Sequence, residues 1–166
     1  MIIDQDRIKT QLHTWMSEFV EVANPKLGNW PPCPFARLSR LNNKIEILFS
    51  EISNLFFDTM SCVDLLETKD VVVICFDHRQ INPIVLQELI VGINKTLMPR
   101  NYVVLEDHPD SPEYINGVKM NFGACGLLVV QKLDKLNLAS DQLKDKGYYF
   151  FWNKESLDNV VTWRYK

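Results

Sequence analysis

Two histidines follow apolar stretches of the sequence and are the first candidates for chemistry. The apolar run 71–76 leads into Asp77-His78, and the run 102–106 leads into Asp107-His108. A helical crossover of about 20 residues between two strands favours parallel pairing. Both imidazoles would then emerge at the carboxyl edge of the sheet, where α/β folds bind ligands. The sequence therefore predicts a site at this edge.

Cys33 could join the histidines there, because a short helix is expected from Pro34 to about Leu41. Unpaired N–H groups and the helix dipole would favour the Cys33 thiolate, which serves as a nucleophile or a metal ligand. The alternative is that Cys33 is a small residue packed between prolines, and that the histidines are hydrogen-bonded rim residues.

Charged neighbours supply the remaining roles of such a site. His108 would act as a base or ligand, with Asp107 or Asp110 as the carboxylate that orients it. Arg37, four residues after Cys33, could hold an anionic group of the substrate. An exposed, charged helix face is the alternative interpretation of this arginine.

A divalent metal is the one cofactor that the sequence suggests. His78, His108 and Asp110 are the candidate ligands, and acidic residues surround His108. The chain has no H-x-x-x-H spacing, no EF-hand loop and no paired C-x-x-C motifs, and an acidic loop is more often a solvated one. The cofactor therefore stays unassigned.

Composition narrows the class of protein. The chain has 166 residues, 46% of them hydrophobic, with a net charge of −3, which predicts one globular domain over residues 1–166. An acidic chain has no overall attraction for nucleic acid or anionic membranes. The longest apolar run is far too short to span a membrane, and four cysteines occur without a C-x-x-C pair. We expect a cytoplasmic protein with neither nucleic acid nor membrane as a partner.

Apolar periodicity predicts the elements that would position these residues. Helices are expected over 4–22, 34–41, 50–66, 82–97, 133–146 and 154–163, and strands over 45–49, 71–76, 102–105 and 127–130. A long polar connection without regular structure is expected over 106–126. The predicted fold is α/β, a small two-layer or three-layer sandwich. It has a mainly parallel or mixed four-stranded sheet, an N-terminal helix and two C-terminal helices.

Five consecutive aromatic residues, 148–152, lie between the last two predicted helices. Core packing together with a subunit interface explains such a run, so a homo-oligomer formed through this aromatic C-terminal segment is expected. Bases could stack on the rings, but no basic residues are interleaved with them.

The segment Cys33-Pro34-Phe35-Ala36-Arg37 resembles a family of small bacterial proteins of unknown function with a Cys-Pro-Phe-Ala motif. The strand leading into His108-Pro109-Asp110, and Asn121 before an apolar strand, extend the resemblance over about 30–138. The chain also looks like proteins of marine phages and cyanobacteria with similar Trp-x-x-Cys-Pro-Phe-Ala openings. The resemblance implies that Cys33 and His108 are site residues, and it implies no particular reaction. Arg37 and Asn121 are the candidates for contact with substrate.

Two functions follow as expectations. The first is a small-molecule enzyme or ligand-binding protein with a Cys/His site at the carboxyl edge of the sheet, using Cys33, His108 and Asp107 for catalysis. The second is a noncatalytic protein-interaction role, such as a phage-encoded structural or host-regulating subunit.

Overall fold

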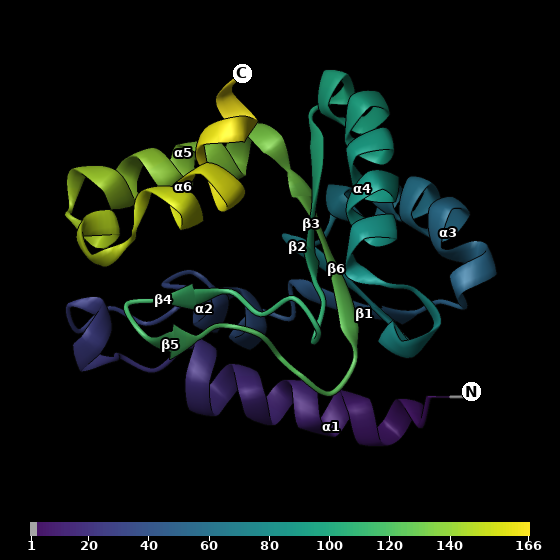
Figure 1. The fold of residues 1–166 in the computed structure, drawn as a ribbon, viewed down its shortest axis with the longest axis horizontal. Coiled ribbons are helices and arrows are strands. Elements are labelled where there is room, and N and C mark those ends of the chain that lie inside the picture. The colour runs from purple at the N-terminus through teal and green to yellow at the C-terminus, as the bar shows by residue number, and fades with distance from the viewer. Residues whose placement is uncertain (1–2) are drawn as a thin grey trace.

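The four apolar stretches predicted as strands form one central sheet. The computed structural model describes residues 3–166. The sheet contains β1 (Ile45–Phe49), β2 (Val71–Phe76), β3 (Tyr102–Asp107) and β6 (Gly126–Lys132), in the order β1-β2-β6-β3. β1 and β2 are parallel, and β6 is antiparallel to both β2 and β3. β2 and β3 therefore point the same way with β6 between them, and the expected α/β fold with a mixed four-stranded sheet is confirmed (Figure 1).

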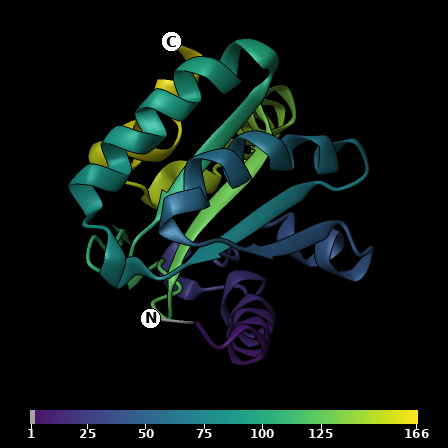
Figure 2. The same cartoon turned by 90° about the vertical axis from the view of Figure 1, so that its right-hand side faces the viewer.

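Helices cover both faces of this sheet and make three layers. One face carries α3 (Leu55–Ser61) and α4 (Pro83–Leu97), and the other carries α1 (Gln5–Trp15) with the α5 (Leu133–Asp145) and α6 (Lys154–Val160) pair (Figures 1 and 2). Short helical turns join them: η1 Met16–Val20, η2 Pro25–Leu27, η3 Ile52–Asn54, η4 Cys62–Glu67, η5 His78–Gln80, η6 Met98–Arg100, η7 Tyr148–Phe151 and η8 Thr162–Tyr165. The N-terminal helix and the two C-terminal helices are as predicted.

Burial on both faces explains why β2 is a continuous apolar run. Its alternate side chains Val72, Ile74 and Phe76 pack toward α3 and α4, whereas Val73 and Cys75 pack toward α1. Gly126 of β6 lies opposite Phe76, and a Cβ atom at this position would come within 2.2 Å of the Phe76 ring. Glycine is therefore required where the phenyl ring crosses the neighbouring strand.

The segment 106–126, expected to have no regular structure, contains a small hairpin. β4 (Tyr114–Ile115) pairs with β5 (Val118–Lys119) through Asn116-Gly117, whose φ angles of 47° and 80° are both in the left-handed region. This is the two-residue turn that Asn-Gly favours between antiparallel strands. The strands have only two residues each, too few to show an alternating pattern in the sequence.

A second difference concerns the helix after Cys33. α2 (Ala36–Leu41) begins three residues after Cys33, not at Pro34.

None of the helices within residues 3–166 has the length and apolar character to cross a membrane.

Candidate functional site

The two candidate histidines lie side by side at one edge of the sheet. β2 and β3 point the same way, so the segments that follow them emerge together. The ring centroids of His78 and His108 are 5.6 Å apart with perpendicular planes. The side chain of His108 is buried at 3% exposure, whereas His78 is half-buried. The two histidines are thirty residues apart in the sequence but are in direct contact in the fold.

Hydrogen bonds occupy both ring nitrogens of His108. Nδ1 accepts from the backbone N–H of Asp110 at 3.1 Å, which places the ring proton on Nε2. Nε2 in turn donates to the Ile81 carbonyl at 2.8 Å and lies 3.2 Å from the His78 carbonyl. No lone pair of His108 faces a substrate or a metal ion, so in this conformation the ring joins two loops and is not placed as a base or ligand.

Asp107 is tied to the loop before β6, not to His108. Its Oδ1 accepts from Asn121 Nδ2 at 2.7 Å, and its Oδ2 accepts from the Phe122 backbone N–H at 3.0 Å. Asn121 Oδ1 accepts from the Glu113 N–H at 2.6 Å. Desolvation raises the pKa of Asp107, and these hydrogen bonds oppose the rise. The Asn121 amide, predicted to contact substrate, is therefore engaged in holding the 107–122 loop.

The metal prediction finds no support in this geometry. Asp110 donates its backbone N–H to Nδ1 of His108, so this nitrogen is already hydrogen-bonded to the protein. Across residues 3–166, no three side chains of His, Cys, Asp or Glu are placed so that they could share a metal ion. His78, His108 and Asp110 therefore do not form the predicted ligand set.

Cys33 and Arg37 lie away from the histidines. The Cys33 backbone N–H donates to the Val20 carbonyl at 3.0 Å, and the thiol is near Glu21 and Tyr148. Cys33 has exposed surface, but the protein packed around its sulfur desolvates it and raises the thiol pKa. The backbone groups of Phe35 and Ala36 lower the Cys33 pKa, as expected at a helix start, but desolvation of the sulfur has the larger effect. Arg37 is exposed on α2.

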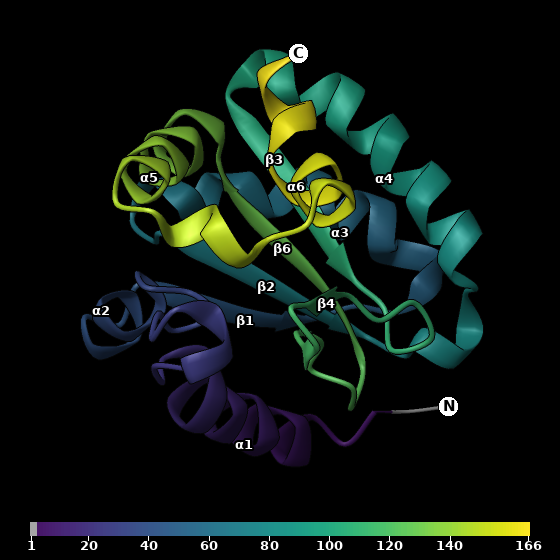
Figure 3. The same ribbon diagram turned by 60° about the vertical axis from the view of Figure 1, so that its left-hand side comes forward.

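A long groove runs along the open edge of β3, and we call it the edge groove. Residues of α4 form one wall, residues of α6 and η8 form the other, and residues of β3 form the floor. Figure 3 shows how the ribbons of α4, α6 and β3 are arranged. Its volume is about 1030 Å³, at the upper end of the range for ligand sites. Its apolar lining includes Ile84, Val91, Leu105, Met120, Trp152 and Trp163. Asp107, His108 and Asn121 stand at the end of the edge groove near the carboxyl end of β3.

Charged groups stand around this apolar lining. Lys95 of α4 and Lys166 lie in the edge groove, as do Glu106, Asp107 and Glu113. Glu113 accepts a hydrogen bond from Ser156 Oγ at the start of α6. Desolvation raises the pKa of Glu106, whose carboxylate also accepts from its own backbone N–H. The edge groove thus combines a large apolar surface with a few polar groups, the usual composition of a ligand site.

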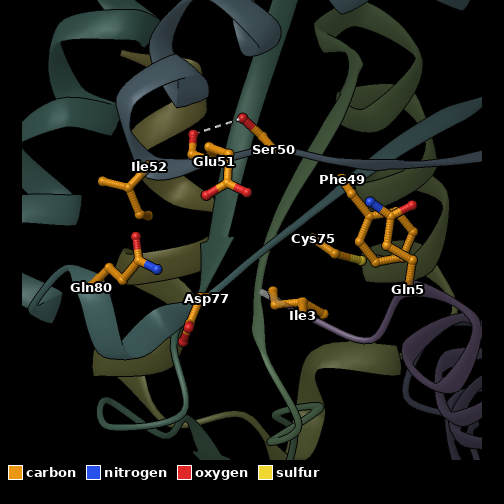
Figure 4. Close-up of a pocket in the computed structure, with 9 residues that line it drawn as sticks. All are labelled: Ile3, Gln5, Phe49, Ser50, Glu51, Ile52, Cys75, Asp77 and Gln80. Carbon is orange, nitrogen blue, oxygen red and sulfur yellow. Dashed lines mark hydrogen bonds between the residues drawn. The ribbon is translucent and has the colours of Figure 1, made fainter. Parts of the chain in front are cut away.

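A second, smaller pocket lies at the carboxyl ends of β1 and β2 (Figure 4). Its volume is about 150 Å³, well below that of a typical ligand site. Ser50 and Asp77 line it, together with Gln80. Arg79 donates to both oxygens of Asp77, at 2.7 and 3.0 Å, and this pairing lowers the Asp77 pKa. The pocket is therefore a weaker candidate than the edge groove.

The aromatic C-terminal segment is divided between the interior and the surface. Tyr148 is buried, donates to the Pro32 carbonyl and packs edge-on against Trp30. Trp152 faces the edge groove, and Phe150 is 81% exposed. Most of the run is thus used inside the chain, and an interface through it would depend mainly on Phe150.

The walls of the edge groove contain the residues that the sequence analysis missed. Ile84 and Val91, seven residues apart on α4, are exposed and lie outside the core stripe of that helix. This seven-residue spacing could have indicated the wall from the sequence, since it marks a second apolar stripe on one helix. Nothing in the sequence indicated that α6 and Trp163 would lie opposite.

Comparisons with protein-family models, with curated proteins and with solved structures gave no match to this chain. The resemblance to the Cys-Pro-Phe-Ala family therefore stays a prediction, and the functional argument rests on the geometry of the site.

Proposed function

We propose that this protein is a ligand-binding protein and that the edge groove is its binding site. One observation carries the proposal: a groove of about 1030 Å³ lined by exposed apolar side chains of α4 and by half-buried ones of β3 and the C-terminal elements. Apolar surface left in contact with water is costly, and an extended patch of it marks an interaction site. A ligand that covers Ile84, Val91 and Trp163 would remove this apolar surface from water.

The proposal keeps the expected place of the site but not its expected chemistry. The edge groove reaches the carboxyl end of β3, where the ligand was expected. A Cys33–His108 catalytic pair is not part of the proposal, because Cys33 lies elsewhere and both nitrogens of His108 are engaged. The edge groove would therefore hold its ligand without covalent catalysis by this pair.

The uncharged apolar dye Nile red tests the proposal, because its fluorescence rises when it enters an apolar site. Ile84→Arg places a charge in the edge groove, and Leu38→Arg on α2 is the matched control, since the two leucine-sized side chains are 71% and 66% exposed. We expect Ile84→Arg to weaken dye binding about fivefold or more, because a charge is costly against an apolar ligand. Leu38→Arg should leave dye binding unchanged, and circular dichroism checks that both variants fold. Loss of binding in the Leu38 variant, with normal binding in the Ile84 variant, would refute the proposal.

A protein-interaction role is the second candidate, and the exposure of Phe150 favours it. A single large aromatic side chain on the surface is typical of an anchor at an interface. If this role holds, the mass measured by light scattering exceeds that of one chain, and Phe150→Ser reduces it to 19.4 kDa. A wild-type mass of one chain at all concentrations excludes self-association through Phe150.

A further inference from the structure

The shape of the edge groove restricts the ligands that can fill it. Its α4 wall runs from Pro83, the first residue of the helix, to Met98 just beyond its end. Fifteen helical residues with a rise of about 1.5 Å each make this wall roughly 22 Å long. A compact metabolite covers only part of that length, whereas an extended chain of about six or seven residues, at about 3.3 Å per residue, spans all of it.

The two ends of the edge groove carry opposite charges. α4 runs antiparallel to β3, because Asn94 contacts Val104 and the segment before α4 contacts His108. Lys95 therefore lies near the start of β3, and Lys166 lies at this same end (Figures 1 and 3). Asp158 also lines the groove near Lys166, and its carboxylate is paired with Lys154. The acidic groups Glu106, Asp107 and Glu113 lie toward the other end, beyond the middle of β3.

Protein cations compensate the acidic end only in part: Lys119 favours the charged form of Asp107 without forming an ion pair with it. Asp107 and Glu113 accept hydrogen bonds from neutral amide and hydroxyl groups, and Glu106 accepts from its own backbone. None of these three carboxylates takes part in an ion pair within residues 3–166. A cationic group on the ligand would supply the counter-charge at the acidic end. A carboxylate on the ligand would do the same for Lys95 and Lys166 at the opposite end of the edge groove.

Asn94 determines how a bound chain could be recognised. Its Nδ2 donates to the Val104 carbonyl at 3.0 Å, and its Oδ1 accepts from the Val104 N–H at 2.9 Å. This side chain satisfies the middle of the open edge of β3, where an added strand would otherwise pair. Recognition therefore depends on ligand side chains lying against Val91, Leu105 and Trp163, not on a backbone ladder along β3.

We propose that the edge groove binds an extended peptide segment of another protein. The segment has apolar side chains in its middle, a basic side chain at the Glu106 end and an acidic side chain at the Lys95 end. This inference rests on the proposed function, because it names the class of ligand for the same groove. Apolar contact supplies the affinity, and the two charges fix the position of the segment along β3.

Fluorescence anisotropy with short labelled peptides tests the inference. The probe is the peptide Lys-Leu-Val-Leu-Val-Glu, acetylated and amidated so that only its side chains are charged, and the reference peptide has Gln at both ends. Each is titrated against wild type, Glu106→Gln and Glu88→Gln. Glu88 is the matched control, because it is also exposed but lies on α4 away from the edge groove.

A thermodynamic cycle between peptide and protein gives the decisive comparison. We expect Glu106→Gln to weaken binding of the lysine peptide about three- to fivefold, the effect of one partly desolvated charge pair, and to leave the Gln peptide unchanged. Glu88→Gln should change neither. Equal loss for both peptides, or the same loss in the Glu88 variant, would overturn the assignment of the charged ends.

Failure of this inference and failure of the proposed function give different results. One result is that neither peptide binds, while the dye still binds and Ile84→Arg weakens its binding. The proposed peptide class is then wrong, and the binding site stands. If the dye binding is also insensitive to Ile84→Arg, the edge groove is not the binding site, and both proposals fall.

Discussion

At the scale of single residues, the polar side chains at the end of β3 are used to hold loops together. His108 joins the segment after β2 to the segment after β3, and Asp107 binds Asn121 and the Phe122 N–H. A buried hydrogen-bonding group that loses its partner costs more than the bond contributes while it is made. The same residues therefore set the shape of the carboxyl end of the edge groove.

Replacing Asp107 should destabilise the protein, and replacing Asp110 should not. Asp107→Ala leaves the Asn121 amide and the Phe122 N–H without their acceptor, for which we expect a loss of about 1–3 kcal/mol in the free energy of unfolding. Asp110→Ala removes an exposed carboxylate and should change it by less than about 0.5 kcal/mol. Urea denaturation measures both. An equal loss in the two variants would mean that the Asp110 carboxylate has a role that the structure does not give it.

Binding of the lysine peptide should weaken as the pH is lowered. Desolvation raises the pKa of Glu106, so this carboxylate takes up its proton at a higher pH than an ordinary glutamate does. The carboxylate form attracts the lysine side chain, and the protonated form does not. Affinity measured from neutral pH downward should therefore fall as the pH passes this raised pKa, and Glu106→Gln should reduce the pH dependence. A fall confined to the ordinary glutamate range, equal in wild type and variant, would contradict this assignment.

Residue types in the sequence identified which side chains meet, but not what they do. The placement of His78 and His108 followed from the common direction of two strands, which apolar runs and crossover length indicate. The roles of the His108 nitrogens depend on where the backbones of residues 81 and 110 turn. Loop geometry of this kind has no periodic signal, so chemistry was assigned to a ring that is already fully hydrogen-bonded.

At the scale of elements, the open edge of β3 is the feature with the clearest consequence. β3 pairs with β6 on one side only, and Asn94 of α4 occupies the middle of its free edge. Unpaired edge strands pair readily with other chains, and native proteins protect them. A single amide side chain thus keeps the floor of the edge groove from pairing with a second strand.

Asn94→Leu should both destabilise the protein and make it associate. The leucine has a similar size but leaves the Val104 N–H and carbonyl unsatisfied, so we expect a loss of about 2–4 kcal/mol in the free energy of unfolding. Light scattering should show a mass that rises with concentration. Thr96→Leu, at an exposed position of α4, is the control and should show neither effect. A stable, monomeric Asn94→Leu protein would mean that the edge is protected in another way.

Strands were predicted better than the connections between them. The run 71–76 matches β2 in full, because a strand buried on both faces is apolar at every position. Nothing in the sequence indicated that β6 lies between β2 and β3, since the order of strands along the chain does not specify which strands are neighbours in the sheet. The helix after Cys33 starts two residues later than predicted, at Ala36, and the backbone N–H of Cys33 donates to the Val20 carbonyl.

At the scale of the whole molecule, the edge groove exists because elements distant in the sequence enclose the third strand. α4 comes from the middle of the chain, and α6 and η8 come from its end. Their facing sides carry apolar residues, of which Ile84 and Val91 are exposed, together with charges of opposite sign at the two ends. A feature assembled in this way cannot be read from any one segment, which is why the sequence analysis predicted a site at the carboxyl edge of the sheet but did not predict the walls of the edge groove.

An amide chemical-shift map of the protein with bound Nile red is the most direct test of the edge groove as the binding site. We expect the largest changes at Val91, Lys95 and Leu105 and at the indole N–H of Trp163, with little change at Leu38 on α2. Changes centred instead on α2, or on the small pocket around Ser50 and Gln80, would contradict the account.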